Sequence, residues 1–227
     1  MEKNIFAPIN PGEKHIAVAL VVDISLSMMG RPIEELNNGL KSFGQALQED
    51  LLALGRADIT IISFSSTVQT ELEFKPATEY LAPHLSISGL TVLNEAIDTA
   101  LDALEIRKKV YKEYGIDYYR PWLFVLTDGK ASDNEKEIST KTKLRDYINR
   151  GKVTFFPMGI GEGADINKLR DYYPENAASK PVLSADKDNF KEAFVWLSNS
   201  LIELMQSART GTEIVLPTVP PTLTVEV

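Results

Sequence analysis

Three short segments of the sequence carry oxygen-bearing side chains suited to binding a divalent cation. These side chains are Asp23, Ser25, Ser27, Thr91 and Asp128. Hydroxyl and carboxylate oxygens are hard ligands for Mg²⁺, Mn²⁺ or Ca²⁺, and octahedral Mg²⁺ that keeps several waters suits such a mixed set best. Because the set holds only two carboxylates, the cation would keep much of its charge. We therefore predict a metal site that attracts an acidic group from outside, with no catalytic residue.

Each segment also has an ordinary structural explanation when it is taken alone. Asp23 could cap a loop, Thr91 could be a helix N-cap, and residues 127–129 (Thr-Asp-Gly) could form a turn. Their order along the chain, with each segment at the end of an apolar stretch or at the start of a helix, favours the metal site.

Apolar stretches and helical periodicity alternate along the chain. Residues 16–22 (IAVALVV) lack polar alternation and predict a strand that is covered on both faces. Further strands are expected at 58–64, 67–74, 122–126, 153–160 and 181–183, and helices at 32–49, from 91, at 135–150, 165–172 and 190–204. This order predicts an α/β fold: a doubly wound, mostly parallel, Rossmann-like central sheet of about six strands, with one antiparallel edge strand and helices on both faces.

The predicted topology places the candidate ligands at one edge of the sheet. Ligands of open parallel sheets bind beyond the carboxyl ends of the strands, where the strand order reverses. If the strands at 16–22 and 122–126 are neighbours at that reversal, Asp23 and Asp128 face each other across it. Ser25 and Ser27 are two residues apart, so both hydroxyls can point to one side of an extended loop.

We divide the chain into a lead-in (1–14), one domain (15–207) and a Thr- and Pro-rich tail (208–227). The tail could contribute a binding strand or lack regular structure, and we expect the latter. A glycine-rich turn at 159–163 departs from phosphate-binding spacing and is expected to lead to an N-cap at Asp165.

Composition narrows the possible functions. The formal net charge is −8, which disfavours nucleic-acid binding, and we expect the basic run 107–109 to be a solvated helix end. The absence of cysteine excludes disulfides and thiolate chemistry. The first residues lack the pattern of a signal peptide, and the longest apolar run is too short to cross a membrane, so we expect a soluble cytoplasmic protein without membrane partners.

The pattern Asp-x-Ser-x-Ser, a later Thr and Thr-Asp-Gly resembles the metal-ion-dependent adhesion site (MIDAS) of von Willebrand factor type A domains. Within that family the chain is similar to bacterial TerY/YegL-like proteins over residues 15–205. This similarity rests on residues 32–37, 39–40, 107–112, 118–122 running into 127–129, and 194–198.

The resemblance implies a division of roles within the site. Ser25 and Ser27 would bind Mg²⁺ directly, and Thr91 directly or through water. Asp23 and Asp128 would act mainly through water and hydrogen bonds, and a Glu or Asp of a partner protein would take the open coordination position. The resemblance further implies a setting in bacterial stress response, including tellurite resistance, with protein kinase or phosphatase companions.

Two residues depart from the family pattern. Leu26 stands between the two serines, where Gly is frequent, and Leu90 precedes Thr91, where a small residue is frequent. We expect metal binding to survive, because the backbone at Leu26 need not be left-handed, but the rim of the site becomes more hydrophobic.

Two enzyme classes could also use an acid at the end of the first strand. A haloacid-dehalogenase-type phosphatase needs a second Asp two residues after Asp23, where Ser25 stands. A magnesium-dependent hydrolase needs a general base, and His15 and His84 are far apart in sequence. We therefore expect a binding module, with the hydrolase as the alternative.

Overall fold

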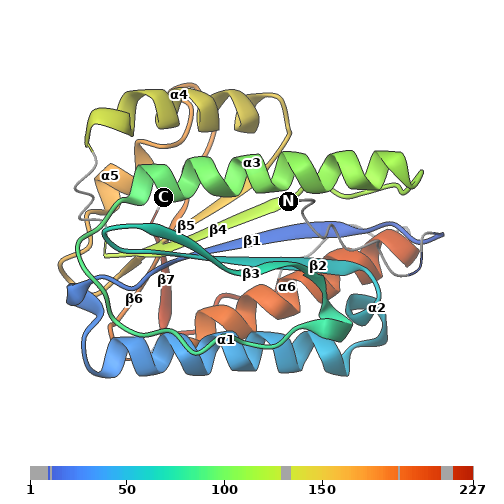
Figure 1. Ribbon diagram of the computed structural model, residues 1–227, viewed down its shortest axis with the longest axis horizontal. Coiled ribbons are helices and arrows are strands. Elements are labelled where there is room, and N and C mark those ends of the chain that lie inside the picture. The colour runs from blue at the N-terminus through green and yellow to red at the C-terminus, as the bar shows by residue number, and fades with distance from the viewer. Residues whose placement is uncertain (1–9, 11, 129–133, 189, 211–216, 227) are drawn as a thin grey trace.

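The central sheet organises the molecule. The computed structural model describes residues 10, 12–128, 134–188, 190–210 and 217–226. Over these residues, seven strands form one sheet in the order β3-β2-β1-β4-β5-β6-β7 (Figure 1). The strands are β1 (Ile16–Asp23), β2 (Ala57–Phe64), β3 (Val68–Pro76), β4 (Trp122–Thr127), β5 (Thr154–Ile160), β6 (Val182–Ala185) and β7 (Leu223–Glu226). Neighbouring strands from β2 to β6 are parallel, and both edge strands are antiparallel.

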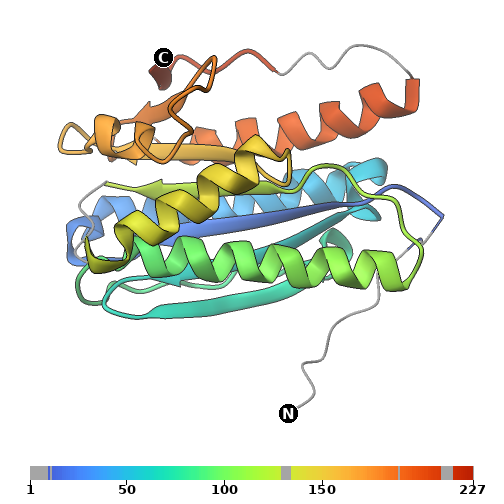
Figure 2. The same ribbon diagram turned by 90° about the horizontal axis from the view of Figure 1, so that it is seen from above.

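Helices cover both faces of the sheet. They are α1 (Arg31–Glu49), α2 (Leu51–Leu54), α3 (Leu93–Glu113), α4 (Asn134–Asn149), α5 (Ile166–Arg170) and α6 (Lys191–Thr210). Helices α1 and α6 lie on one face, and α3, α4 and α5 lie on the other (Figures 1 and 2). Two buried apolar clusters fill the spaces between the layers. The predicted doubly wound α/β architecture is confirmed.

The burial of β1 on both faces explains why its sequence lacks polar alternation. All eight of its residues are buried. Val18, Leu20 and Val22 pack into the cluster under α1 and α6, whereas Ala17, Ala19 and Val21 pack into the cluster under α3. A strand covered on both faces requires apolar residues at every position, which is the basis of the prediction from the sequence.

Helices α1 and α6, which cover the same face of the sheet, approach each other closely. Gly39 of α1 lies against Phe194 of α6, and a Cβ at Gly39 would lie 2.3 Å from the Cδ2 atom of that buried ring. The absence of a side chain at Gly39 is therefore a condition of this helix contact.

The C-terminal segment corrects one expectation. Residues Leu223–Glu226 form β7, which pairs with β6 from Val182 to Ala185, so the expectation of a tail without regular structure is wrong for these four residues. The indole Nε1 of Trp196 also donates to the carbonyl of Pro217 over 3.0 Å. Turn-forming residues precede β7, and a four-residue strand without alternation gives little signal in the sequence. No helix in the described part of the chain combines the length and apolar character needed to cross a bilayer.

The basic run at 107–109 corrects a second expectation. Arg107 is only 1% exposed, and Lys108 is also buried, so these two residues are not part of a solvated helix end. Arg107 Nη2 lies 3.0 Å from Asp58 Oδ2, and the same carboxylate oxygen lies 3.2 Å from His15 Nδ1 and accepts from the Tyr111 hydroxyl over 2.5 Å. The buried carboxylate at the start of β2 requires cationic and hydroxyl partners, which α3 provides.

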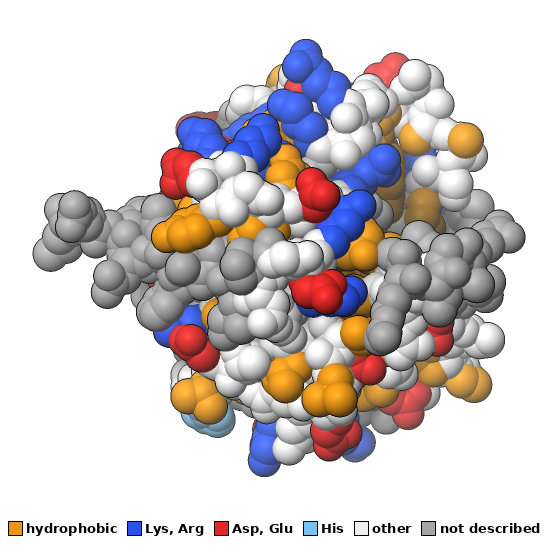
Figure 3. Space-filling view, turned by 90° about the vertical axis from the view of Figure 1, so that its right-hand side faces the viewer, with side chains coloured by type: hydrophobic (Ala, Val, Ile, Leu, Met, Phe, Trp, Pro, Cys, Tyr) orange, Lys and Arg blue, Asp and Glu red, His pale blue; other side chains and the backbone are white. Residues whose placement is uncertain are grey.

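Exposed basic side chains nevertheless occur at the same end of the molecule. Lys109 and Lys112, near the end of α3, are exposed. Figure 3 looks onto the end of the sheet at which the parallel strands begin. Lys and Arg side chains gather across the upper half of this view. The candidate ligands lie at the opposite edge.

Candidate metal centre

Strands β1 and β4 are neighbours at the point where the strand order reverses. Val22 pairs with Leu126, so Asp23 and Thr127 follow side by side at the carboxyl ends of the two strands. The chain runs from β1 to β2 on one side and from β4 to β5 on the other. The topology on which the predicted site depends is therefore confirmed.

Asp23 is buried, and both of its carboxylate oxygens accept hydrogen bonds. Oδ1 accepts from the backbone N–H of Ser25 over 2.8 Å, and Oδ2 accepts from the hydroxyl of Thr127 over 2.7 Å. The first bond fixes the turn that follows β1, and the second joins β1 to β4. Asp23 therefore orients Ser25 and Thr127. Residues that orient metal ligands without contacting the ion make hydrogen bonds of this kind.

The hydroxyl groups of Ser25 and Ser27 lie together above this carboxylate. Their Oγ atoms are 3.0 Å apart. Two adjacent ligands of an octahedral ion with bonds of about 2.1 Å are separated by about 3.0 Å, whereas the longer bonds of Ca²⁺ require about 3.4 Å. The two hydroxyls are within hydrogen-bond distance of each other, and the same separation is compatible with adjacent ligands of an ion of the size of Mg²⁺.

Thr91 reaches the same edge through the loop that precedes α3. The backbone N–H of Leu26 donates to the carbonyl of Gly89 over 3.2 Å, and the N–H of Val92 donates to the carbonyl of Ser65 over 2.8 Å. These bonds tie the loop around Thr91 to the ends of β1 and β2. The N-cap residue of α3 is Val92 and has no side-chain capping bond, so Thr91 does not occupy the capping position considered from the sequence.

Asp128 follows Thr127 directly and is buried. Burial raises the pKa of Asp23 above its ordinary value; hydrogen bonds from Ser25 and Thr127 oppose this rise, and the charge of Asp128 adds to it. Two carboxylates held this close in a buried place favour a cation beside them. Gly129, the third residue of the Thr-Asp-Gly motif, lies outside the described residues.

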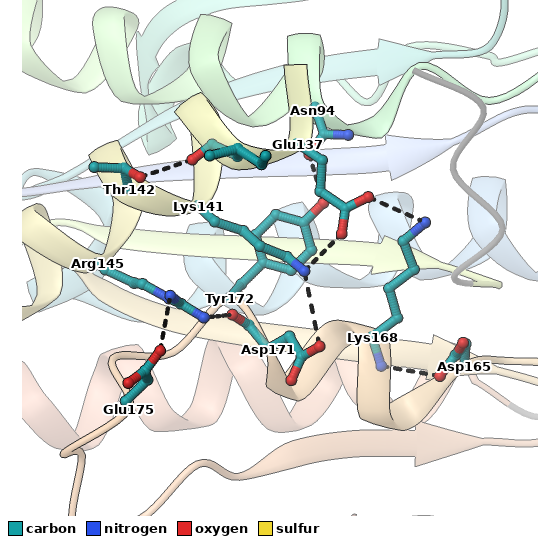
Figure 4. Close-up of polar contacts among 11 residues, drawn as sticks. Asn94, Glu137, Lys141, Thr142, Arg145, Asp165, Lys168, Asp171, Tyr172 and Glu175 are labelled. Atoms are coloured by element: carbon teal, nitrogen blue, oxygen red, sulfur yellow. Dashed lines mark hydrogen bonds and ion pairs between the residues drawn. The ribbon is translucent and has the colours of Figure 1, made fainter. Parts of the chain in front are cut away.

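A network of charged side chains supports the α3 end of the site (Figure 4). Glu137 of α4 lies 2.6 Å from Lys141 and 3.5 Å from Lys168 of α5, and the hydrogen bond from Lys141 is the main reason that the pKa of Glu137 is lowered. The hydroxyl of buried Tyr172 donates to Asn94 Oδ1 over 2.6 Å. Asn94 is in the first turn of α3, three residues from Thr91, so the bond from Tyr172 ties the start of α3 to the segment after α5.

The rim of the site is apolar, as expected from its two leucines. Leu26 is 55% exposed, Leu90 is 65% exposed, and Met29 is also exposed. Leu26 begins a short 3₁₀ turn, and Asn10 is the one non-glycine residue with positive φ among those described. Leu26 therefore needs no left-handed backbone, and its side chain points outward.

Two contributors to the site were absent from the predicted ligand set. The Thr127 hydroxyl was grouped with its motif but given no role. Lys187 Nζ donates to the carbonyl of Ser27 over 3.2 Å across 160 residues of sequence. A single lysine in a loop carries no recognisable pattern, so only the fold brings it to the site.

Over the described residues, the structure holds no site built from several acids or histidines. In the part of the chain that the structure describes, no three or more His, Cys, Asp or Glu side chains come together in a way that could hold a metal ion. The hydroxyl-based set at the ends of β1 and β4 is therefore the candidate. Hydroxyl ligands leave a divalent cation with most of its charge, and such a cation can bind a carboxylate.

Comparisons with known proteins agree with the fold. The sequence profile of the von Willebrand factor type A domain matches residues 17–194. Inter-alpha-trypsin inhibitor heavy chain H3 of Bos taurus is 25% identical over 208 residues, covering 88% of this chain and 22% of the relative. Heavy chain H1 of Mesocricetus auratus is 24% identical over 195 residues, covering 82% and 20%. The chain thus spans about a fifth of the length of these relatives.

Solved structures show the same fold. The pilus adhesin SpaC from Lactobacillus rhamnosus GG in its open conformation has a TM-score of 0.66 at 14% identity, over 87% of this chain and 31% of the adhesin. The ArnB paralog VWA2 from Sulfolobus acidocaldarius has a TM-score of 0.54 at 19% identity, over 83% of this chain and 45% of that protein. With the strand order, the site at the ends of β1 and β4 and the profile match over most of its length, this chain belongs to the von Willebrand factor type A domain family.

Proposed function

We propose that this domain binds Mg²⁺, or a divalent ion of similar size such as Mn²⁺, and presents it to an acidic residue of a partner protein. The single observation that carries this proposal is the Ser25–Ser27 hydroxyl pair, spaced 3.0 Å apart. That spacing matches adjacent ligands of an octahedral ion of this size. Domains of this family act as protein-interaction modules, often in a metal-dependent way.

In the proposed site, Ser25 and Ser27 bind the ion directly, and Thr91 binds directly or through water. Asp23 and Asp128 balance the charge of the ion mainly through water and hydrogen bonds. The two oxygens of Asp23 already accept bonds from Ser25 and Thr127. The ion supplies a positive centre that accepts the partner's carboxylate. This division leaves one coordination position for a Glu or Asp from outside.

The surroundings of the site favour an acidic residue with apolar neighbours. Leu26, Met29 and Leu90 are exposed at the rim and offer apolar contact area. The ammonium group of Lys187 lies beside the Ser27 carbonyl and adds positive charge that attracts an acidic segment. We infer a partner segment in which an acidic residue is flanked by apolar side chains.

From the resemblance of residues 15–205 to TerY/YegL-like proteins, we further propose a cytoplasmic role in bacterial stress response, including tellurite resistance. Kinase or phosphatase companions of such proteins are the first partners to test. A magnesium-dependent hydrolase at the same strand ends is not favoured, because Asp23, the acid at the end of β1, is buried and its oxygens are already engaged. Magnesium-dependent turnover of phosphate esters by the purified chain would contradict the docking function.

Thermal unfolding with and without metal tests the proposal. Saturating Mg²⁺ or Mn²⁺ stabilises the folded state by about 2–3 kcal/mol at a hundredfold excess over Kd, which corresponds to a rise of roughly 5–10 °C in Tm for a chain of this size. Asp23→Ala is expected to abolish this rise. Because Asp23 is buried, Ser27→Ala provides a second test, since exposed Ser27 can lose its hydroxyl without disturbing the core.

The matched control is Ser139→Ala, which removes the hydroxyl of another exposed serine on α4. This variant is expected to keep the full metal-dependent rise in Tm. If the wild type shows no rise with either metal, or if Ser27→Ala retains it, the proposed metal site is wrong.

A further inference from the structure

A second, polar pocket adjoins the proposed metal site. It has a volume of about 320 Å³ and lies between the end of the β2–β3 hairpin and the segment 84–88. Its hydroxyl groups come from both sides: Ser63, Ser65, Thr67, Ser86 and Ser88. A volume of this size is at the small end of the range for ligand pockets, about 300–1,000 Å³.

Most of these hydroxyl groups are available to a ligand. Ser63 donates to Glu71 Oε1 over 2.5 Å. Among the described residues, nothing forms a hydrogen bond with the hydroxyls of the other four. Ser65 is only 2% exposed overall and lines the pocket with the other hydroxyl groups. A hydroxyl can donate one hydrogen bond and accept others, so these groups can meet either kind of polar ligand atom.

The charge of the pocket selects the kind of ligand. Among the described residues that line the pocket, Glu71 is the acidic side chain, His84 contributes an imidazole, and none is Lys or Arg. Within the described part of the chain, no basic side chain pairs with Glu71. A carboxylate among hydroxyl groups accepts hydrogen bonds from an ammonium or a guanidinium group.

A β-bulge aims Glu71 into the pocket. Ile61 pairs with Leu72 and Ile62 pairs with Thr70, so Glu71 is the extra residue on β3. Leu72 packs against the cluster under α1 and α6, and Glu71 lines the pocket on the same face, beside Ser63. In a regular strand two consecutive side chains would point to opposite faces, and a bulge re-aims one of them.

The pocket shares a wall with the metal site. Ile24 lines the pocket and lies between Asp23 and Ser25. Ser65, in the pocket wall, accepts from the N–H of Val92, the residue after Thr91. An extended peptide advances about 3.3 Å per residue, so side chains one to three residues apart lie roughly 3–10 Å apart along the peptide, which is the range expected for two adjoining sites.

We propose that this pocket binds the cationic group of a Lys or Arg that lies one to three residues from the partner's metal-binding acidic residue. The inference rests on the proposed function and specifies its partner: a segment that pairs an acid with a nearby base. A bare metal ion does not suit the pocket, because its volume equals that of about ten waters at roughly 30 Å³ each, too wide for the wall to ligate one ion.

Short peptides provide the probe. The set consists of acetylated and amidated alanine-based peptides with one Asp and one Lys, separated by zero, one or two residues, and matched peptides with norleucine in place of Lys. Calorimetry in saturating Mg²⁺ is expected to show that at least one Lys peptide binds about tenfold more tightly than its norleucine partner, the gain of one charge-assisted contact. Equal affinities at every spacing would overturn the inference.

Glu71→Gln keeps the size and the Ser63 contact but removes the charge. This variant is expected to lose the preference for Lys and to bind the norleucine peptides as the wild type does. The matched control is Glu73→Gln, an exposed acid two residues further along β3, which is expected to keep the preference. If Glu73→Gln loses the preference and Glu71→Gln keeps it, the pocket is not the cation site.

A metal-free measurement separates this inference from the proposed function. Agmatine, added in the presence of a chelator, is expected to shift the amide NMR signals of Ser65, Ser86 and Ser88 in the wild type but not in Glu71→Gln. If agmatine gives these shifts while Mg²⁺ gives no rise in Tm, the metal function fails and the cation pocket stands. If both norleucine and Lys peptides bind equally with Mg²⁺ and agmatine gives no shifts, the metal function stands and the pocket inference fails.

Discussion

The hydroxyl of Thr127 donates to Asp23 Oδ2 over 2.7 Å, joining residues that are 104 positions apart in the sequence. This bond links the ends of β1 and β4 where the strand order reverses. It also occupies one carboxylate oxygen, while the other accepts from Ser25 N–H. The carboxylate that holds the backbone of Ser25 is therefore itself held by a threonine of the neighbouring strand.

Thr127→Val replaces the hydroxyl by a methyl group of similar size. Because Asp23 loses one of its two orienting bonds, we expect the affinity for Mn²⁺ to fall about tenfold or more, as is usual when a group behind the direct ligands is removed. Leaving a buried acceptor without this donor should also cost about 1–3 kcal/mol of stability. Calorimetric titration and denaturant unfolding measure the two effects.

Thr60→Val is the matched control. Thr60 is buried in β2, and its hydroxyl donates to the carbonyl of Leu72 over 2.7 Å, away from the metal site. We expect a similar loss of stability with unchanged affinity for Mn²⁺. Equal affinities of the two variants would show that the bond between Thr127 and Asp23 does not orient the site.

Gly89→Ala tests the loop that carries Thr91. Gly89 has φ of +49°, and a Cβ there would lie 2.1 Å from Ser66 Oγ and 3.0 Å from Ser66 N. The carbonyl of Gly89 also accepts from Leu26 N–H, so the clash displaces the loop relative to the serines. We expect weaker metal binding and a loss of stability about 1–3 kcal/mol greater than backbone strain alone.

Gly115→Ala is the control, because it measures the cost of a left-handed backbone without a steric clash. Gly115 has φ of +66°, but a Cβ at this position meets no atom within 4 Å. We expect a cost of about 1–2 kcal/mol from the left-handed backbone, with full metal affinity. Should both alanine variants lose the same stability and keep their affinity for metal, the close approach of Gly89 to Ser66 has no bearing on the site.

The buried Asp58 network predicts a specific loss of stability in acid. Burial alone would raise the pKa of Asp58, but the hydrogen bond from His15, the charge of Arg107 and the Tyr111 hydroxyl together hold it below the ordinary value of 3.8. The unfolded chain therefore binds this proton more tightly than the folded chain. The stabilisation is fully present above pH 3.8 and is lost as the pH falls through the lower pKa of the folded state.

Asp58→Asn removes this charge. It leaves the buried Arg107 guanidinium without its anion, and we expect a loss of about 3–5 kcal/mol at neutral pH with a flatter dependence on pH in acid. Asp102→Asn, at an exposed ion pair with Lys143, is the control and should cost less than about 1 kcal/mol. Urea unfolding from about pH 7 to pH 2.5 measures both. An equally steep acid dependence in Asp58→Asn and the wild type would contradict the role of Asp58.

Gly39→Ala sets helix propensity against packing. Alanine favours a helix over glycine by about 1 kcal/mol, whereas overpacking a filled core costs about 1–3 kcal/mol. Since the new Cβ would lie 2.3 Å from the buried ring of Phe194, we expect a net loss of stability. Asn38→Ala, at the adjacent exposed position, should gain a few tenths of a kcal/mol. A Gly39→Ala variant more stable than the wild type in denaturant unfolding would show that α1 and α6 adjust freely.

The main elements could be predicted because their signals are local. Residues 16–22 are apolar at every position, and the structure covers β1 on both faces. Asp165 stands before a short helical pattern and accepts from Lys168 N–H as the N-cap of α5. The adjacency of β1 and β4 was a condition of the predicted site, based on the general topology of parallel sheets, and the structure meets it.

The features that could not be predicted depend on partners distant in the sequence. Arg107 has the pattern of an exposed helix residue, and only the position of Asp58 under α3 explains its burial. The bulge at Glu71 cannot be recognised from the sequence of β3 alone, because a bulge is defined by the pairing of β3 with β2. Lys187 reaches Ser27 from the loop between β6 and α6. In each case the decisive contact forms only once the sheet has assembled.

The short strand β7 has a consequence for solubility. It occupies the hydrogen-bonding side of β6 that would otherwise be open, and three of its four residues face solvent. An open strand such as β6 offers unpaired backbone groups to a strand from another molecule, and that is a route to aggregation. A chain shortened before Leu223 would therefore keep the ends of β1 and β4 intact and yet self-associate through β6, at the lateral border of the sheet.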